Sequence, residues 1–251
     1  MHKSHRFFVE ELSFPGSVVQ LSREESHHLS RVLRISPGEK VILMDGRGKT
    51  ALAKVVQTAQ RRQPALCEIE AITEHRHRGP RFVLAVAPPR NQQMSLIVRA
   101  TTELGVSRIV PLRTVRSESQ PRKQPGHWRD HALAAIKQSG NPFLPEICNP
   151  ISLRDYIATD PGPGYFGSLR ESAGACEVAV PVRSDERDAQ AEISFCIGPE
   201  GGLTEEEERL LMEAGFEPVS LGPFVLRVET AAIASLVWLN SKYRKLDESF
   251  C

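Results

Sequence analysis

Short apolar runs separated by turn residues dominate the first part of the chain. Pro-Gly pairs at 15–16 and 37–38 bound such runs, and this pattern is typical of β-strands. One helix is expected among the strands, because Ser22 and Glu25 form a capping box in front of apolar residues at helical spacing. Several short strands with one helix predict a small closed β-barrel, which we place at residues 1–74. The expected strands are 5–10, 17–21, 40–45, 50–58 and 65–73.

A polar stretch that ends in Gly-Pro, residues 75–80, separates this region from a second one. From there, apolar strand-like runs alternate with amphipathic segments. In the first of the expected helices Met94, Ile97 and Leu104 share one face. Such alternation predicts an α/β domain, residues 80–251, with a parallel sheet covered by helices on both faces. The expected strands are 82–87, 108–112, 165–168, 193–197 and 218–221, and the helices are 91–104, 127–139, 204–214 and 229–240.

The predicted strand 193–197 runs into a glycine-rich loop, with the sequence Ile-Gly-Pro-Glu-Gly-Gly-Leu at residues 197–203. Glycines let the backbone turn sharply and come close to a ligand. The helix that follows begins at a capping box of Thr204 and Glu207. A second glycine turn at 221–223 precedes Leu-Arg-Val-Glu-Thr-Ala at 226–231. If the strand before the second turn is a neighbour, these turns converge on a pocket made mostly of main chain, suited to a flat heterocycle.

The loop at 197–203 does not match two well-known phosphate-binding motifs. No Gly-Lys-Ser/Thr follows it, and its glycine spacing is not that of a dinucleotide fingerprint. For this loop alone, an ordinary glycine turn before a well-capped helix remains the alternative.

The net charge of +1 conceals a division between the two parts of the chain. Residues 1–141 hold 23 Lys+Arg and 12 Asp+Glu, a balance of +11, whereas residues 142–251 hold 9 and 19, a balance of −10. A basic N-terminal part favours a nucleic-acid surface, with mutual neutralisation of the two parts as the alternative.

Composition excludes several other classes of protein. No apolar run approaches the ~18 residues of a membrane span, and the N-terminus lacks the apolar centre of a signal peptide, so we expect a cytoplasmic protein. The five cysteines are odd in number and widely spaced, with no C-x-x-C pair. Neither a disulfide framework nor a zinc site is therefore expected.

Six blocks, taken in order, resemble those of the ribosomal RNA small subunit methyltransferase E family. This family belongs to the SPOUT superfamily of S-adenosylmethionine-dependent RNA methyltransferases. The blocks are Arg6-Phe7-Phe8, HLSRVLR at 28–34, TELGV at 102–106, QSGN at 138–141, GPEGGL at 198–203 and LRVETA at 226–231. The resemblance covers nearly the whole chain. It departs at Arg90 and Arg99, where Lys is usual, and at Asn141, where an Arg is common; the effect of Asn141 on activity is left open.

The resemblance implies a SPOUT-type parallel α/β sheet with a C-terminal trefoil knot, preceded by a PUA-like RNA-binding β-barrel domain. It also implies methylation of N3 of a uridine in small-subunit (16S) ribosomal RNA, within an assembled or nearly assembled subunit. S-adenosylmethionine is the expected cofactor, no metal is expected, and the family is homodimeric.

The candidate cofactor-binding residues are those of the two glycine turns, namely Ile197, Gly198, Glu200, Gly201, Gly202, Leu221, Gly222 and Leu226. The candidate catalytic residues are Arg227 and Glu229. A cation such as Arg227 would favour the anion that forms when uracil N3 loses its proton, and a carboxylate could take that proton. The alternatives are an Arg227–Glu229 pair and a purely structural Glu229 at the start of a helix.

For RNA, the candidate residues are Arg6, Arg31 and Arg34, which would contact phosphates, and Arg90, which would lie at the mouth of the catalytic site. The alternative for the first three is a solvated surface. On an α-helix Arg31 and Arg34, three positions apart, would project to one side. Arg113 and Arg116 extend the expected basic surface.

Two other functions stay open from the sequence. One is a non-catalytic RNA-binding factor in ribosome assembly, and the other is a SPOUT enzyme that methylates a ribose 2′-hydroxyl. The intact glycine turns disfavour the first, and the N-terminal blocks disfavour the second.

Overall fold

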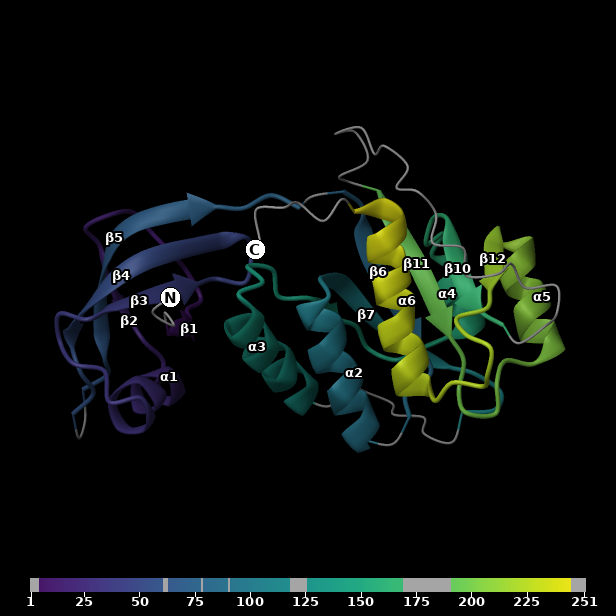
Figure 1. Ribbon diagram of the computed structural model, residues 1–251, viewed down its shortest axis with the longest axis horizontal. Coiled ribbons are helices and arrows are strands. Elements are labelled where there is room, and N and C mark those ends of the chain that lie inside the picture. The colour runs from purple at the N-terminus through teal and green to yellow at the C-terminus, as the bar shows by residue number, and fades with distance from the viewer. Residues whose placement is uncertain are drawn as a thin grey trace. The chain divides into compact units, whose positions relative to one another are not determined.

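The computed structural model describes residues 5–60, 63–77, 79–89, 91–117, 126–168 and 191–244. The chain divides into two compact units. Figure 1 colours the ribbon by residue number, so the segments of each unit can be followed in it. The N-terminal unit comprises Met1–Arg76 with Leu133–Leu144, and the C-terminal unit comprises His77–Ala132 with Pro145–Cys251. Residues 133–144 thus group with the N-terminal strands, although they lie within the region expected to form the α/β domain.

The N-terminal unit contains a five-stranded sheet in the order β1-β3-β4-β5-β2. β1 is parallel to β3, and the other pairs are antiparallel. Closing this sheet into the predicted barrel would need hydrogen bonds between β1 and β2, which pair only with β3 and β5 among the described residues. The strands are β1 (Arg6–Phe8), β2 (Val18–Gln20), β3 (Lys40–Met44), β4 (Lys49–Gln57) and β5 (Leu66–Glu74).

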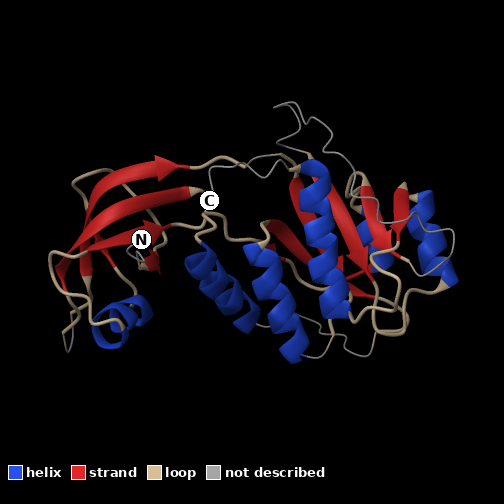
Figure 2. Ribbon diagram, in the orientation of Figure 1, coloured by secondary structure: helices blue, strands red, loops and turns tan. Residues whose placement is uncertain are grey.

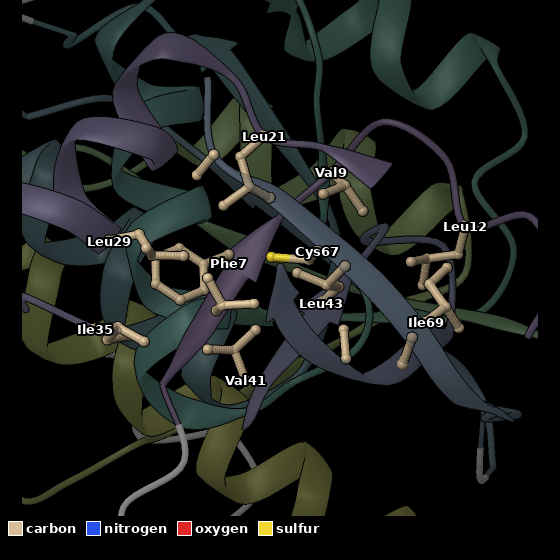
Figure 3. Close-up of a cluster of buried hydrophobic side chains, with 14 residues drawn as sticks. Phe7, Val9, Leu12, Leu21, Leu29, Ile35, Val41, Leu43, Cys67 and Ile69 are labelled. Carbon is tan, nitrogen blue, oxygen red and sulfur yellow. The ribbon is translucent and has the colours of Figure 1, made fainter. Parts of the chain in front are cut away.

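Alternating burial along the strands builds the core of this unit, which Figure 3 shows. In β4, Ala51, Ala53 and Val55 are buried while the residues between them are exposed. Phe7 and Cys67 are fully buried in the same cluster. Short strands are marginal by themselves, so this shared apolar burial is what holds them together.

The helical part of the N-terminal unit differs from the prediction. Ser22 Oγ accepts a hydrogen bond from the Glu25 N–H at 3.2 Å, but the Glu25 carboxylate pairs with Lys137 Nζ, so only half of the capping box forms. The single expected helix is a short α-helix, α1 (Arg23–His27), followed by a π-helix, η1 (His28–Val32).

Residues 133–144 are tied to the N-terminal strands by hydrogen bonds to main-chain atoms. The Arg6 guanidinium donates to the carbonyl oxygen of Lys137 at 3.2 Å. The Leu144 N–H donates to the carbonyl oxygen of Gly46 at 2.8 Å. These bonds join positions far apart in the sequence, so local patterns give no sign of them.

The C-terminal unit contains a seven-stranded sheet, ordered β12-β10-β11-β6-β7-β8 with β9 also pairing with β7. Every pairing in it is parallel, as predicted. The strands are β6 (Arg81–Val86), β7 (Val106–Arg113), β8 (Glu146–Ile147), β9 (Ile151–Ser152), β10 (Gly164–Gly167), β11 (Glu192–Ile197) and β12 (Phe216–Val219). The helices are α2 (Asn91–Glu103), α3 (His127–Ser139, shared with the N-terminal unit), α4 (Leu153–Ala158), α5 (Glu205–Glu213) and α6 (Val228–Tyr243).

Helices cover both faces of this sheet, because neighbouring residues of a strand point to opposite sides. Cys196 lies in one cluster with Tyr156 of α4 and Leu211 of α5. The next side chain, Phe195, faces α6 instead, where its ring centroid is 5.9 Å from that of Trp238. Figure 2 shows α6 crossing in front of the strands.

Helix α6 carries apolar residues on several sides. Ala232, Leu236 and Leu239 are fully buried, but Val237 is 51% exposed, so one side of the helix is open in the isolated chain. None of the helices in the described part of the chain is both long enough and apolar enough to cross a membrane.

Candidate functional site

Three parallel strands end together at one edge of the C-terminal sheet. β10 ends at Gly167, β11 at Ile197 and β12 at Val219, and β10 lies between the other two. The carboxyl ends of parallel strands are the usual ligand-binding edge of an open α/β sheet. A pocket lies there, with about 620 Å³ of space when its open mouth is included.

The pocket lining combines glycine-rich main chain with apolar side chains. It comes from the ends of the three strands, the loops after β11 and β12, and the first turn of α6. The lining residues are Gly167, Ser168, Ile197, Gly198, Pro199, Glu200, Gly202, Leu203, Val219, Leu221, Gly222, Phe224, Val225, Leu226, Val228 and Ala231.

Two positions in the loop after β11 require glycine. A Cβ at Gly198 would lie 2.9 Å from Leu203 Cγ and 3.1 Å from Leu203 N, so no side chain fits. Gly202 has φ +71°, a conformation that disfavours side chains, and its N–H donates to the Pro199 carbonyl at 2.8 Å. The sequence therefore forms a tight turn whose main chain reaches the pocket.

Helix α5 anchors this loop. Thr204 Oγ1 accepts from the Glu207 N–H at 3.2 Å, and Glu207 Oε2 accepts from the Thr204 N–H at 2.8 Å, which is the capping box predicted from the sequence. Gly215, at φ +84°, follows the helix in the left-handed conformation expected there.

The loop after β12 forms the opposite wall and carries an apolar rim. Phe224 and Val225 are 78% and 73% exposed, although both line the pocket. Contact between these side chains and a bound molecule is favourable, because it removes their apolar surface from water. Ser220 Oγ donates to the carbonyl of Gly222 at 3.2 Å and so steadies the second glycine turn.

The structure gathers most of the candidate cofactor residues around this pocket. Only Gly201 among them is absent from the lining, and its carbonyl faces Arg116, whose Nη1 donates to it at 2.8 Å. The lining residues that sequence reasoning missed are Gly167, Ser168, Pro199, Leu203, Val219, Phe224, Val225, Val228 and Ala231. Gly167 and Ser168 could have been found from the strand predicted at 165–168, because in a parallel sheet its carboxyl end lies beside those of the other strands.

The candidate catalytic residues lie next to the lining but are not part of it. Arg227 is the N-cap residue of α6, directly after Leu226, and it is exposed. Glu229 is partly buried in the first turn of α6. The Arg227–Glu229 ion pair, considered as an alternative, is not found among the described residues.

The candidate RNA residues have different surroundings. Arg6 is partly buried and its guanidinium is engaged by carbonyl groups within the N-terminal unit. Arg31 and Arg34 are exposed, but the spacing argument for them was wrong, because the helix there is a π-helix that ends at Val32 and Arg34 follows it with φ 55°. Arg90 lies outside the described residues.

No group of three or more His, Cys, Asp or Glu side chains that could hold a metal occurs in the described ranges. Burial raises the pKa of the Cys148 thiol to about 11 and that of Cys196 well above its usual range. At neutral pH both are protonated, and a thiol in this state is a poor nucleophile.

A parallel α/β sheet with a pocket at the carboxyl ends of its strands defines a ligand-binding domain of the α/β class. Residues 77–240 match the family described as the RNA methyltransferase domain, and residues 21–63 match the RNA methyltransferase PUA domain. The chain therefore belongs to the RNA methyltransferase family, alongside the ribosomal RNA small subunit methyltransferase E proteins.

Curated relatives from several bacteria carry that name, and two of them illustrate the similarity. The protein of Aquifex aeolicus is 30% identical over 92% of this chain and 96% of its own length. That of Synechocystis is 28% identical over 95% of this chain and 78% of its own length.

Two solved structures share the whole fold. The ribosomal RNA small subunit methyltransferase E of Neisseria gonorrhoeae, bound to S-adenosylmethionine, is 28% identical with a TM-score of 0.80, covering 96% of this chain and 98% of that one. A methyltransferase of Legionella pneumophila, also with S-adenosylmethionine bound, is 28% identical with a TM-score of 0.82, covering 95% and 98%.

Proposed function

We propose that this protein transfers the methyl group of S-adenosylmethionine to N3 of a uridine in small-subunit (16S) ribosomal RNA. The observation that carries the proposal is the pocket at the carboxyl ends of β10, β11 and β12, made of glycine turns and apolar side chains. The name of the relatives supports the RNA substrate, and the cofactor bound to the Neisseria gonorrhoeae protein supports the methyl donor.

The donor groups of the pocket suit an adenosine compound. Main-chain N–H and C=O groups in the glycine turns can meet the edge of a heterocycle, and Ile197 and Leu226 offer apolar surface to its faces. Glu200, exposed at the pocket, offers acceptor oxygens to hydroxyl or ammonium groups. S-adenosylmethionine supplies a methyl group activated by a sulfonium.

The protein contributes alignment and electrostatics to the reaction. Holding the nucleophile and the methyl carbon in line lowers the activation free energy, on the order of several kcal/mol, because the reacting groups no longer need to find this orientation. We assign to the exposed Arg227 the stabilisation of the anion at the uracil ring, and to the partly buried Glu229 the acceptance of the N3 proton.

We assign RNA binding to residues 1–74, as a PUA-like domain, with residues 80–251 as the methyltransferase domain. The match of residues 21–63 to a PUA domain and the positive balance of the N-terminal part support this assignment. Arg31 and Arg34 are exposed and available to phosphates. Arg6 also has a structural role, because its guanidinium donates to the Lys137 carbonyl.

We further propose that the C-terminal segment forms the trefoil knot of the SPOUT superfamily and that the protein acts as a homodimer. The path of the chain supports the knot, since α6 returns from β12 at one edge of the sheet to pack on β6 and β11 near its middle. Val237, an apolar side chain of α6 that is exposed in the single chain, supports an intermolecular contact. Sedimentation equilibrium measures the mass, and a monomer at micromolar concentration excludes the dimer.

Mapping of the methylated nucleoside tests the reaction. Small ribosomal subunits that lack the modification are incubated with the protein and S-adenosylmethionine, and the RNA is digested and analysed by mass spectrometry. We expect the added methyl group on a uracil base. A methyl group on the ribose would favour the 2′-hydroxyl enzyme, and a protein that fails to bind S-adenosylmethionine by calorimetry would be the assembly factor instead.

A further inference from the structure

A compact turn follows β7 on the outer side of the pocket loop. In this turn the Ser117 N–H donates to the Thr114 carbonyl at 3.2 Å, and Ser117 Oγ accepts from the Thr114 N–H at 3.1 Å. The two hydroxyl groups are 2.7 Å apart, and Thr114 is buried. These bonds give the turn one conformation, so the residues between its ends, Val115 and Arg116, are held in place.

Arg116 reaches from this turn to the loop after β11. Its Nη1 donates to the Gly201 carbonyl at 2.8 Å and to the Leu203 carbonyl at 3.3 Å. Its aliphatic stem lies over Gly201, where an added Cβ would be 3.4 Å from Arg116 Cβ and Cδ. No ion pair of Arg116 occurs among the described residues, so these carbonyls are the acceptors that the structure gives its guanidinium.

The same turn also holds the beginning of α5. The Val115 N–H donates to Glu207 Oε1 at 2.8 Å, while Glu207 Oε2 caps Thr204. Glu207 is 6% exposed, and its two oxygens join the turn to the helix N-terminus. The stretch from Gly201 to Glu207 is therefore fastened at both ends to the turn after β7.

Arg116 itself is not among the residues that line the pocket, and of its two acceptors only Leu203 belongs to the lining. Gly201 points its carbonyl to Arg116 and does not line the pocket, whereas its neighbours Glu200 and Gly202 do. A glycine-rich loop has many conformations of similar energy, and charge-assisted hydrogen bonds to its carbonyls select one of them.

We propose that Arg116 is a positioning residue for the cofactor pocket: its guanidinium holds the loop at 198–203 in the conformation that receives the methyl donor. It acts through the Gly201 and Leu203 carbonyls and does not itself contact the cofactor. The role differs from the part in a basic surface that the sequence led us to expect for Arg116, and it rests on the proposed function in so far as the ligand is S-adenosylmethionine.

Calorimetry with S-adenosylmethionine tests the effect on binding. We expect Arg116→Ala to weaken the affinity about tenfold or more, because two charge-assisted bonds are lost, and Arg116→Lys to restore part of it through one donor. With saturating cofactor the methylation rate of Arg116→Ala recovers, so KM for the cofactor rises while kcat changes little. The matched control is Arg209→Ala, which removes an exposed arginine of α5 that pairs with Glu206 and Glu213 and touches no loop carbonyl.

Amide hydrogen exchange of the protein without cofactor tests the loop directly. We expect faster exchange at the Gly202 and Val115 amides in Arg116→Ala and unchanged exchange there in Arg209→Ala. Unchanged exchange and unchanged affinity in Arg116→Ala overturn the positioning role. Loss of affinity for ribosomal subunits with intact cofactor binding overturns it as well, in favour of a phosphate contact. Failure of the unmodified protein to bind S-adenosylmethionine overturns the proposed function instead, and the exchange experiment still decides whether Arg116 holds the loop.

Discussion

At the scale of single residues, the glycines of the pocket give the sharpest test. Gly222 lines the pocket, its φ is outside the left-handed region, and an added Cβ would be 3.8 Å from Leu226 Cδ2. Gly222→Val should therefore fold and fill part of the pocket, and we expect at least about a tenfold loss of affinity for S-adenosylmethionine, since its contacts are displaced. Calorimetry measures this loss.

Another glycine serves as the control for that experiment. Gly126→Val places a side chain where nothing lies within 4 Å, and Gly126 is not among the residues that line the pocket. This variant should keep the affinity of the unmodified protein. Equal losses in Gly222→Val and Gly126→Val would mean that the pocket is not the cofactor site.

Two arginines separate a structural role from an RNA role. Arg6→Ala removes hydrogen bonds to the Lys137 and Gln138 carbonyls, so we expect the free energy of unfolding to fall by about 1 kcal/mol. Arg31 is exposed, so Arg31→Ala should change stability by less than about 0.5 kcal/mol. Denaturant unfolding of both variants measures the difference.

The same two variants are then compared in RNA binding. A phosphate contact at Arg31 predicts that Arg31→Ala lowers the salt dependence of binding by about one unit of slope. If the salt dependence of RNA binding is unchanged in Arg31→Ala, Arg31 does not contact a phosphate of the RNA.

At the scale of elements, the start of α5 carries a prediction of its own. Thr204→Ala removes the hydroxyl that accepts from the Glu207 N–H, and loss of an N-cap lowers stability by about 1 kcal/mol. Thr204→Ser keeps the hydroxyl and should retain most of that stability. Denaturant unfolding followed by circular dichroism gives both values, and equal stabilities of the two variants would show that the cap contributes nothing.

Elements with strong periodicity were predicted well, whereas some of the short elements were missed. Helix α3 begins and ends where its pattern placed it, at His127 and Ser139. The two-residue strands β8 and β9 and the short helix α4 were missed, because so few residues show no periodicity. The π-helix η1 was missed for another reason: its apolar residues were interpreted as part of an α-helix, and the spacing of apolar residues does not distinguish i→i+5 from i→i+4 hydrogen bonds over five residues.

At the scale of the whole molecule, stability should fall at alkaline pH. Burial in the N-terminal core raises the pKa of the Cys67 thiol from 9.0 to about 11. Between these two values the unfolded chain loses the proton while the folded chain keeps it, so unfolding becomes more favourable as pH rises. The expected loss is about 1.4 kcal/mol per pH unit for such a thiol within that window.

The variant Cys67→Ala isolates this contribution from other groups that titrate in the same range. We expect its stability to fall less steeply than that of the unmodified protein between pH 9 and 11, although a small cavity lowers its stability at every pH. The measurement is the midpoint of urea unfolding as a function of pH. Parallel curves for the two proteins would contradict a buried, protonated thiol.

Local chemistry was sufficient for the parallel sheet, the capped α5 and the two glycine turns, because periodicity, capping and backbone freedom are properties of neighbouring residues. Tertiary structure alone placed β10 between β11 and β12, brought Gly167 and Ser168 to the pocket, and turned Gly201 outward to Arg116. It also joined residues 133–144 to the N-terminal strands. These arrangements depend on strand order and on contacts between distant positions, and the energies that select them arise only when those positions meet.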